Sequence, residues 1–98
     1  MWLLKTAEGA DPAYTFRIAP GSIKTIGRSS GAEFMVDAAL VSRLHCQLTA
    51  GASELQVKDL ESTNGTFVNG KRVDDARLNE GDRLGVGRLE FLVSRAAG

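Results

Sequence analysis

The chain has 98 residues, the size of one small domain with a single hydrophobic core. Twelve basic and twelve acidic residues cancel, so no overall charge directs the chain towards nucleic acid. The one cysteine, Cys46, excludes an internal disulfide and suits a reducing compartment, and no apolar run reaches the roughly 20 residues of a membrane span. The opening residues, with a lysine at position 5, lack the pattern of a signal peptide. We therefore expect one intracellular, cytoplasmic domain over residues 1–98, without a membrane partner.

Short strands separated by turns dominate the chain. We expect strands at residues 2–6, 14–18, 23–27, 34–36, 46–49, 54–59, 66–68, 72–73, 83–87 and 89–94. The only candidate helix, residues 37–44, is too short to be stable by itself. Turns rich in glycine recur at intervals of about 8–12 residues, a pattern typical of an all-β sandwich or barrel. A β-sandwich is the predicted fold class.

The segment from Asp59 to Gly70 contains two Asn-Gly dipeptides with different surroundings. Asn69-Gly70 lies between Phe67-Val68 and Arg72-Val73, as in a two-residue β-hairpin. Asn64-Gly65 instead ends a loop that begins with the hydroxyl side chains of Ser62 and Thr63. Those side chains offer hydrogen bonds, and the glycine allows a ligand or another backbone to approach closely. This composition is typical of a binding loop.

Two further loops carry polar residues next to a strand. Gly27-Arg28 ends one expected strand, and Ser42-Arg43-Leu44-His45 precedes another. Taken alone, each arginine would usually be a solvated surface cation, and His45 a structural residue. Together, the three loops offer two arginines, several hydroxyls and an amide. This set suits the binding of a phosphate better than catalysis.

Four motifs follow one another in the chain: Gly-Arg at 27–28, Ser-Arg-x-His at 42–45, Asp-x-x-Ser-Thr-Asn-Gly-Thr-x-Val-Asn-Gly at 59–70, and Leu-x-x-Gly-Asp-x-x-x-x-Gly at 78–87. In order and spacing they resemble the forkhead-associated (FHA) domain over about residues 23–93. The resemblance implies an FHA-like sandwich of about eleven mostly antiparallel strands, with both chain ends together. At the other end, loops would bind a phosphothreonine peptide. The resemblance implies a binding module without a cofactor or metal, not an enzyme.

The resemblance also implies roles for single residues. Arg28 would bind the phosphate through its bidentate guanidinium, and the side chains of Ser42 and Thr63 would contact phosphate oxygens. Arg43 would add a second cationic contact to the phosphate. Asn64 would hydrogen-bond the peptide backbone next to the phosphothreonine, since its amide can both donate and accept.

Other residues would support or tune the site. Gly27, His45 and Gly65 are expected to be structural, with His45 holding its loop through a backbone hydrogen bond. Leu40 and Val41 stand where the family reads the third residue after the phosphothreonine. Because both are apolar, we expect an apolar residue there or weak selection. The preference for threonine over serine is implied by the resemblance alone.

The alternatives differ in what they require. Catalysis by Ser42 and His45 would need an orienting carboxylate that the loop does not offer. Asp74-Asp75, expected in a loop after the hairpin, is more typical of a solvated turn than of a metal site. Cys46 stands where many FHA domains have alanine, and we expect it to be inert.

The sequence also indicates which classes of partner to expect. Net neutrality and the lack of an aromatic and basic strand face disfavour nucleic acid. The expected partner is a phosphothreonine-containing protein, and indirectly the Ser/Thr kinase that writes the mark. The remaining alternative is a phosphate-independent interaction or oligomerisation module that uses a face of the sandwich.

Overall fold

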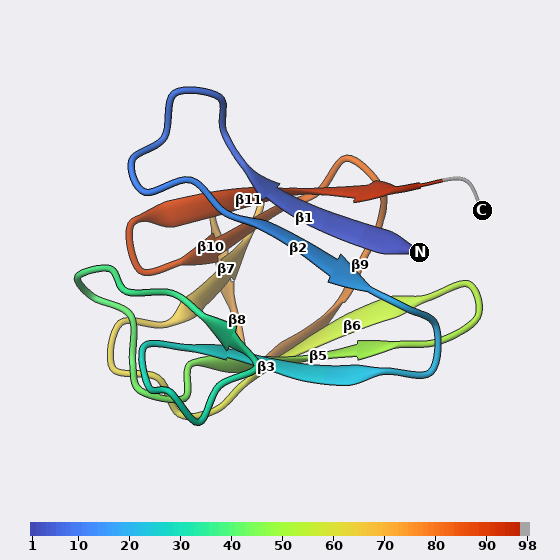
Figure 1. Ribbon diagram of the computed structural model, residues 1–98. Coiled ribbons are helices and arrows are strands. Elements are labelled where there is room, and N and C mark those ends of the chain that lie inside the picture. Colours follow the sequence, from blue (N-terminus) through green and yellow to red (C-terminus); the bar gives the residue numbers. More distant parts are fainter. Residues whose placement is uncertain (97–98) are drawn as a thin grey trace.

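The computed structural model describes residues 1–96, which form eleven strands and no helix (Figure 1). The strands are β1 (Trp2–Thr6), β2 (Thr15–Ile18), β3 (Ile23–Gly27), β4 (Phe34–Met35), β5 (Cys46–Ala50), β6 (Leu55–Asp59), β7 (Thr66–Val68), β8 (Lys71–Val73), β9 (Asp75–Leu78), β10 (Arg83–Val86) and β11 (Leu89–Arg95). Six form one sheet in the order β2-β1-β11-β10-β7-β8, and five form the other in the order β4-β3-β5-β6-β9. Neighbours pair antiparallel except β3 and β4, which are parallel. The predicted all-β sandwich is confirmed.

One strand, β9, was not predicted from the sequence. The sequence predicts a loop at Asp74-Asp75, but Asp75 begins β9, which pairs with β6 at the edge of its sheet. Only Ala76 and Leu78 are apolar in this strand, and Leu78 is buried in the core. Asp75 and Arg77, the charged residues that alternate with them, face outwards, and the alternation is too short to stand out.

The inward side chains of both sheets form one apolar core. Fully buried examples are Leu4, Ile26, Leu48 and Phe91. Burying a side chain of this size contributes roughly 1.5–3 kcal/mol. Because period-two alternation sends every second residue inwards, the same strands leave their polar residues to solvent. The core makes the sandwich a rigid support for its loops.

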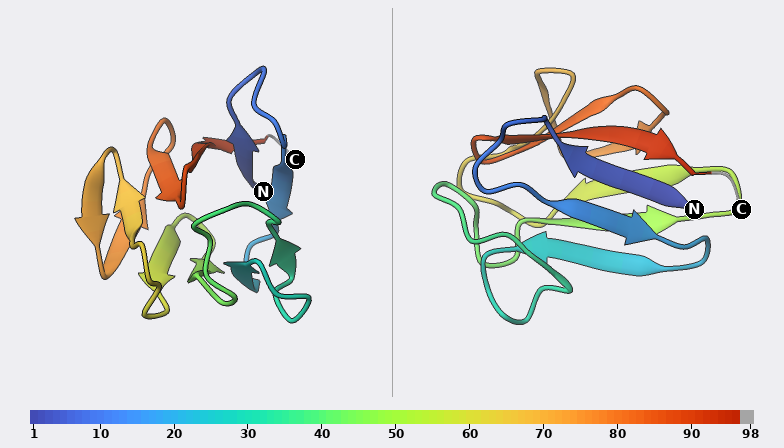
Figure 2. Two further views of the ribbon diagram at one scale, coloured as in Figure 1. Left: turned by 90° about the vertical axis from the view of Figure 1, so that its left-hand side faces the viewer. Right: turned by 45° about the horizontal axis from the view of Figure 1, so that its top comes forward.

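The loops and the chain ends lie at opposite ends of the sandwich. The β3–β4, β4–β5 and β6–β7 loops and the β10–β11 turn lie at one end, which faces the viewer in the left panel of Figure 2. At the other end, β1 pairs with β11 and Ala96 N donates to the Met1 carbonyl oxygen at 2.9 Å. Over residues 1–96, no helix has the length and apolar character needed to cross a membrane.

Candidate functional site

Ser42 lies where three loops meet. Its carbonyl oxygen accepts a hydrogen bond from Arg28 N at 2.9 Å, and its hydroxyl oxygen accepts one from Thr63 N at 3.0 Å. A further bond joins Ser29 N to the Arg43 carbonyl oxygen at 3.1 Å. The loops before β4, before β5 and before β7 are therefore fastened together, and the residues predicted to contact phosphate stand side by side.

Gly27 allows this close approach. A Cβ atom at Gly27 would overlap the Arg43 carbonyl oxygen and lie 2.8 Å from the carbonyl carbon. Only a residue without a side chain lets the β4–β5 loop pass so near the end of β3. Gly27 is buried and Arg28, which follows it, is exposed, so the glycine positions the arginine at the rim.

His45 joins two of the loops from below. It is fully buried, and its Nδ1 accepts a hydrogen bond from Ser42 N at 3.0 Å. The other ring nitrogen, Nε2, lies 2.8 Å from the Gly65 carbonyl oxygen. Because Nδ1 accepts, Nε2 carries the hydrogen and donates it to Gly65. The neutral imidazole thus braces the β4–β5 loop against the β6–β7 loop.

Replacing His45 with alanine is expected to lower the free energy of unfolding by about 3 kcal/mol, because a cavity forms and two backbone groups lose their partners. Urea denaturation measures the loss, and titration with a phosphopeptide in the same buffer measures binding. A supporting role requires that stability and binding fall together. Lost binding in a variant with unchanged stability and loop order would contradict it.

Asp59 organises the β6–β7 loop. Its carboxylate accepts hydrogen bonds from Ser62 Oγ at 2.5 Å, Ser62 N at 3.2 Å and Thr66 Oγ1 at 2.7 Å. Burial raises the pKa of the Asp59 carboxyl, but these hydrogen bonds favour its ionised form more strongly, so the pKa lies below its ordinary value of 3.8. Ser62 Oγ in turn accepts from Gly65 N at 3.0 Å.

Asp59 should therefore stabilise the fold in a pH-dependent way. Because its folded pKa is depressed, its contribution is fully present above about pH 4 and is lost as pH falls towards the folded value. We expect Asp59→Asn to be less stable than the wild type at pH 7, with a difference that shrinks below pH 4. Urea midpoints of both proteins between pH 7 and pH 2 measure this. A constant difference across that range would contradict the assignment.

An open depression of about 580 Å³ lies at the loop end of the molecule. Its lining includes every residue predicted to contact the phosphate or the peptide backbone: Arg28, Ser42, Arg43, Thr63 and Asn64. Ser42 Oγ accepts its hydrogen bond from Thr63 N through a lone pair. The hydroxyl hydrogen of Ser42 therefore stays available to a ligand. Asn64 Nδ2 donates one hydrogen to the Leu40 carbonyl oxygen at 3.1 Å, so its Oδ1 and second hydrogen face no partner within residues 1–96.

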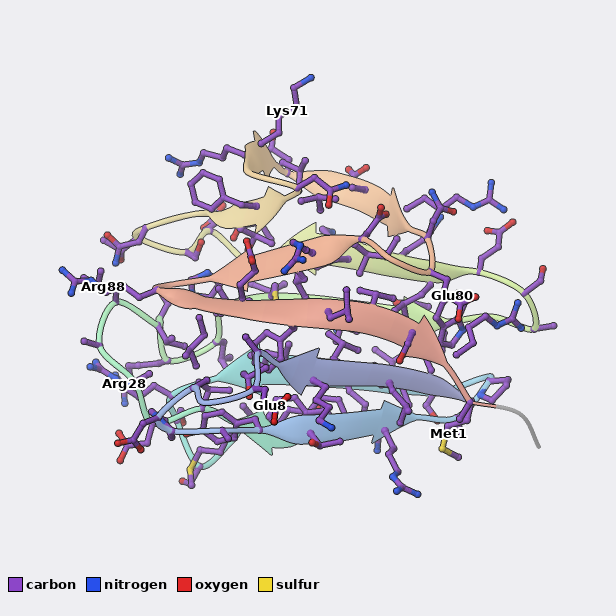
Figure 3. The ribbon with its side chains drawn as sticks, turned by 90° about the horizontal axis from the view of Figure 1, so that it is seen from above. Met1, Glu8, Arg28, Lys71, Glu80 and Arg88 are labelled. Atoms are coloured by element: carbon purple, nitrogen blue, oxygen red, sulfur yellow. The ribbon has the colours of Figure 1, made fainter. Side chains whose placement is uncertain are left out.

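The guanidinium groups in this depression are available to a ligand. Within residues 1–96 the ion pairs are Arg77–Glu54 and Arg83–Glu90, and neither includes Arg28 or Arg43. Figure 3 shows Arg28 projecting outwards at the loop end of the sandwich. Two unpaired guanidiniums beside hydroxyl and amide groups favour an anion such as a phosphate.

The two predicted specificity residues differ in exposure. Leu40 is 42 % exposed and has a positive φ of 70°, whereas Val41 is 2 % exposed. Val41 packs beneath the β10–β11 turn, where a Cβ at Gly87 would lie 2.9 Å from Val41 Cγ2. Leu40 is thus the one that presents its side chain to solvent, with Val41 supporting it.

Three residues in or beside the depression were not predicted as site residues: Leu44 and Glu61, which line it, and Arg72, which lies next to it. Glu61 lines the depression and adopts a positive φ of 56°, which costs a residue with a Cβ about 1–2 kcal/mol. Arg72, in β8, lies over Gly65, where a Cβ would be 2.9 Å from Arg72 Nε. The backbone angle of Glu61 and the position of Arg72 over Gly65 both depend on tertiary structure. No sequence pattern marks either feature.

Among residues 1–96, neither a group of metal ligands nor a reactive thiol is present. Over residues 1–96, no three His, Cys, Asp or Glu side chains are grouped as metal ligands would be. Cys46 is fully buried, and burial raises the pKa of its thiol to about 12, so the thiol stays protonated. The fold and the site together define a recognition domain: a rigid sandwich that holds a cationic, hydroxyl-bearing rim for an anionic ligand.

The comparisons with known proteins name the family. The family model described as "FHA domain" matches residues 24–87, about two thirds of the chain. The chain therefore belongs to the FHA domain family, a family of recognition modules. The family resemblance inferred from the motifs is confirmed.

Three relatives illustrate the match. The glycogen accumulation regulator GarA of Mycolicibacterium smegmatis is 41% identical over 68 residues, which cover 67% of this chain and 43% of GarA. The FHA domain of CT664 from Chlamydia trachomatis has a TM-score of 0.89 at 25% identity and covers 98% of both chains. An FHA domain solved in an analysis of phosphothreonine-dependent FHA domain interactions has a TM-score of 0.87 at 30% identity, covering 98% of this chain and 97% of that one. The chain spans less than half the length of the first curated relatives that it matches.

Proposed function

We propose that this chain is a phosphothreonine-dependent recognition module that binds its partner through the depression at the loop end. The observation that carries this proposal is the convergence of Arg28, Ser42, Arg43 and Thr63 from three hydrogen-bonded loops, with both guanidiniums unpaired within residues 1–96. A phosphothreonine brings about −1.5 to −2 charges and three acceptor oxygens, which match these donors.

Each residue then has a distinct role. Arg28 forms a bidentate pair with the phosphate, and Arg43 adds a second cationic contact. The Ser42 hydroxyl donates to a phosphate oxygen, and Thr63 contacts the phosphate from the β6–β7 loop. Asn64 binds the peptide backbone with the Oδ1 and the second hydrogen that its bond to Leu40 leaves free. Gly27, His45 and Gly65 hold these groups in position.

Leu40 forms an apolar wall of the depression, supported by Val41 beneath it. In this proposal, the wall contacts the third residue after the phosphothreonine. The wall favours an apolar side chain at that peptide position or selects only weakly. A phosphopeptide library that showed strong selection for aspartate at that position would contradict this assignment.

The partner is a phosphothreonine-containing protein of Ser/Thr-kinase signalling, and the chain acts as an adaptor without catalytic activity. The relatives support this, since one solved FHA domain was studied for phosphothreonine-dependent interactions. Kinases write this mark with ATP, so the proposal includes a cytoplasmic location. It also includes all of residues 1–98 as one FHA unit, because β1 and β11 lie inside the six-stranded sheet although the family match covers only 24–87.

Calorimetric titration with one peptide in phosphothreonine, phosphoserine and unmodified forms tests the function. While the partner is unidentified, a degenerate phosphothreonine library serves as the titrant. We expect micromolar-scale binding, about −7 to −9 kcal/mol, for the phosphothreonine form alone, and weaker binding at higher salt. Equal binding of all forms would instead favour a phosphate-independent interaction surface on a face of the sandwich.

A further inference from the structure

Glu61 places a negative charge in a depression that otherwise suits an anion. Its side chain is exposed and lines the same depression as Arg28, Ser42 and Arg43. A phosphate bound by those residues would be repelled by a nearby carboxylate. The presence of an acid at this position therefore needs a reason other than phosphate binding.

The backbone of Glu61 is held in an unfavourable conformation. Its φ of 56° lies in the left-handed region, where glycine is unstrained and glutamate is not. The neighbours hold it there, because Leu60 N donates to the His45 carbonyl oxygen and Ser62 N to Asp59 Oδ2. Strain of this kind is found at binding sites, where it fixes the direction of a side chain.

The Glu61 carboxylate has no partner of its own. Within residues 1–96 it takes part in no ion pair, so it is not bonded to Arg28 or Arg43. The depression thus presents cationic groups and one free anionic group to the same ligand. An exposed carboxylate that has no partner and belongs to a residue lining a binding site is suited to reading the ligand.

We propose that Glu61 is a specificity residue that favours phosphothreonine peptides with a lysine or arginine close to the phosphothreonine and disfavours a neighbouring acid. The inference rests on the proposed function and deepens it. While the phosphate binds Arg28 and Arg43, a basic peptide side chain pairs with the Glu61 carboxylate. The site thus selects a peptide that carries both a phosphate and a nearby basic residue, instead of a peptide that is only negatively charged.

The test uses phosphothreonine peptide libraries in which one position at a time, within three residues of the phosphothreonine, is fixed as lysine, alanine or glutamate. Fluorescence anisotropy measures Kd for the wild type, Glu61→Gln, Glu61→Lys and Glu61→Gly. Glu80→Gln is the matched control, because it makes the same charge change at the opposite end of the molecule (Figure 3). Each titration is repeated at high salt, where an exposed ion pair weakens.

At one position or more, the wild type should bind the lysine library about two- to fivefold more tightly than the alanine library, and the glutamate library more weakly. Glu61→Gln should lose this preference while still requiring phosphothreonine, and Glu61→Lys should reverse it. Glu61→Gly should lose it too, with a melting temperature a few degrees higher because the strain is relieved. Glu80→Gln should behave as the wild type.

Equal preferences in the wild type and Glu61→Gln, with phosphothreonine binding intact in both, would overturn the role of Glu61 and leave the proposed function standing. Failure of the wild type to bind any phosphothreonine library would overturn the proposed function and this inference with it. A lysine preference that disappears equally in Glu80→Gln would assign it to overall charge, which also overturns the inference.

Discussion

Replacing Arg28 with alanine is expected to weaken phosphothreonine-peptide binding by about 100-fold or more while leaving the fold intact. Each charge-assisted hydrogen bond contributes roughly 1.5–3 kcal/mol, and a bidentate guanidinium makes two of them. The side chain is exposed and has no ion pair within residues 1–96, so the folded state loses little without it. The Arg28 N–H, which donates to Ser42, remains in the variant.

Calorimetric titration of wild type and variant with the same phosphothreonine peptide measures this loss, and thermal unfolding checks the fold. Arg28→Lys separates charge from geometry: lysine keeps the charge but cannot form the fork, so we expect a loss of about tenfold. Arg17→Ala is the matched control, since Arg17 is exposed in β2, outside the loops. Unchanged affinity in Arg28→Ala would remove this arginine from the site.

Gly27→Ala is expected to have the largest effect on stability, about 4 kcal/mol or more, which corresponds to a melting temperature lower by about 15–30 °C. The added methyl group would overlap the Arg43 carbonyl oxygen, which belongs to the backbone and cannot rotate away. Either β3 or the β4–β5 loop must move. The bonds Arg28 N to Ser42 O and Ser29 N to Arg43 O would then lengthen or break.

Gly31→Ala provides the comparison for Gly27→Ala within the same β3–β4 loop. A Cβ at Gly31 meets only Ser29 Oγ at 3.5 Å, an ordinary contact, so this variant should be close to wild type. Thermal unfolding of both variants, followed by phosphopeptide titration of whatever remains folded, measures the difference. Equal stability of Gly27→Ala and Gly31→Ala would show that the two loops do not need their close approach.

The sequence predicted most of the fold because most strands alternate over four or more residues. Tyr14, Phe16 and Ile18 share one face in the sequence and in the structure, where Ile18 is buried and the two aromatic rings pack against the core. Strand β9 was missed because its two apolar residues are too few to mark a period. Its place is decided by pairing with β6, which is a long-range contact.

The residues of the site were recognisable from motif spacing, but their contacts were not. The motifs brought Arg28, Ser42 and Thr63 together in the prediction, whereas the bond from Asn64 to Leu40 joins residues 24 positions apart. His45 and Gly65 are 20 positions apart. The left-handed angle of Glu61 could not be read from the sequence either, because glutamate has no preference for it. These features follow from how the loops pack on one another.

The separation of the chain ends from the loops has a mechanical consequence. A tether attached near Met1 and a partner held at the loops would pull the sandwich along its strands, since the strands run between these two ends (Figure 1). Hydrogen bonds between strands are perpendicular to that direction, so the ladders that join β1 to β2 and β11 would be loaded together in shear. The load would then be shared among the hydrogen bonds of both ladders instead of falling on one bond at a time.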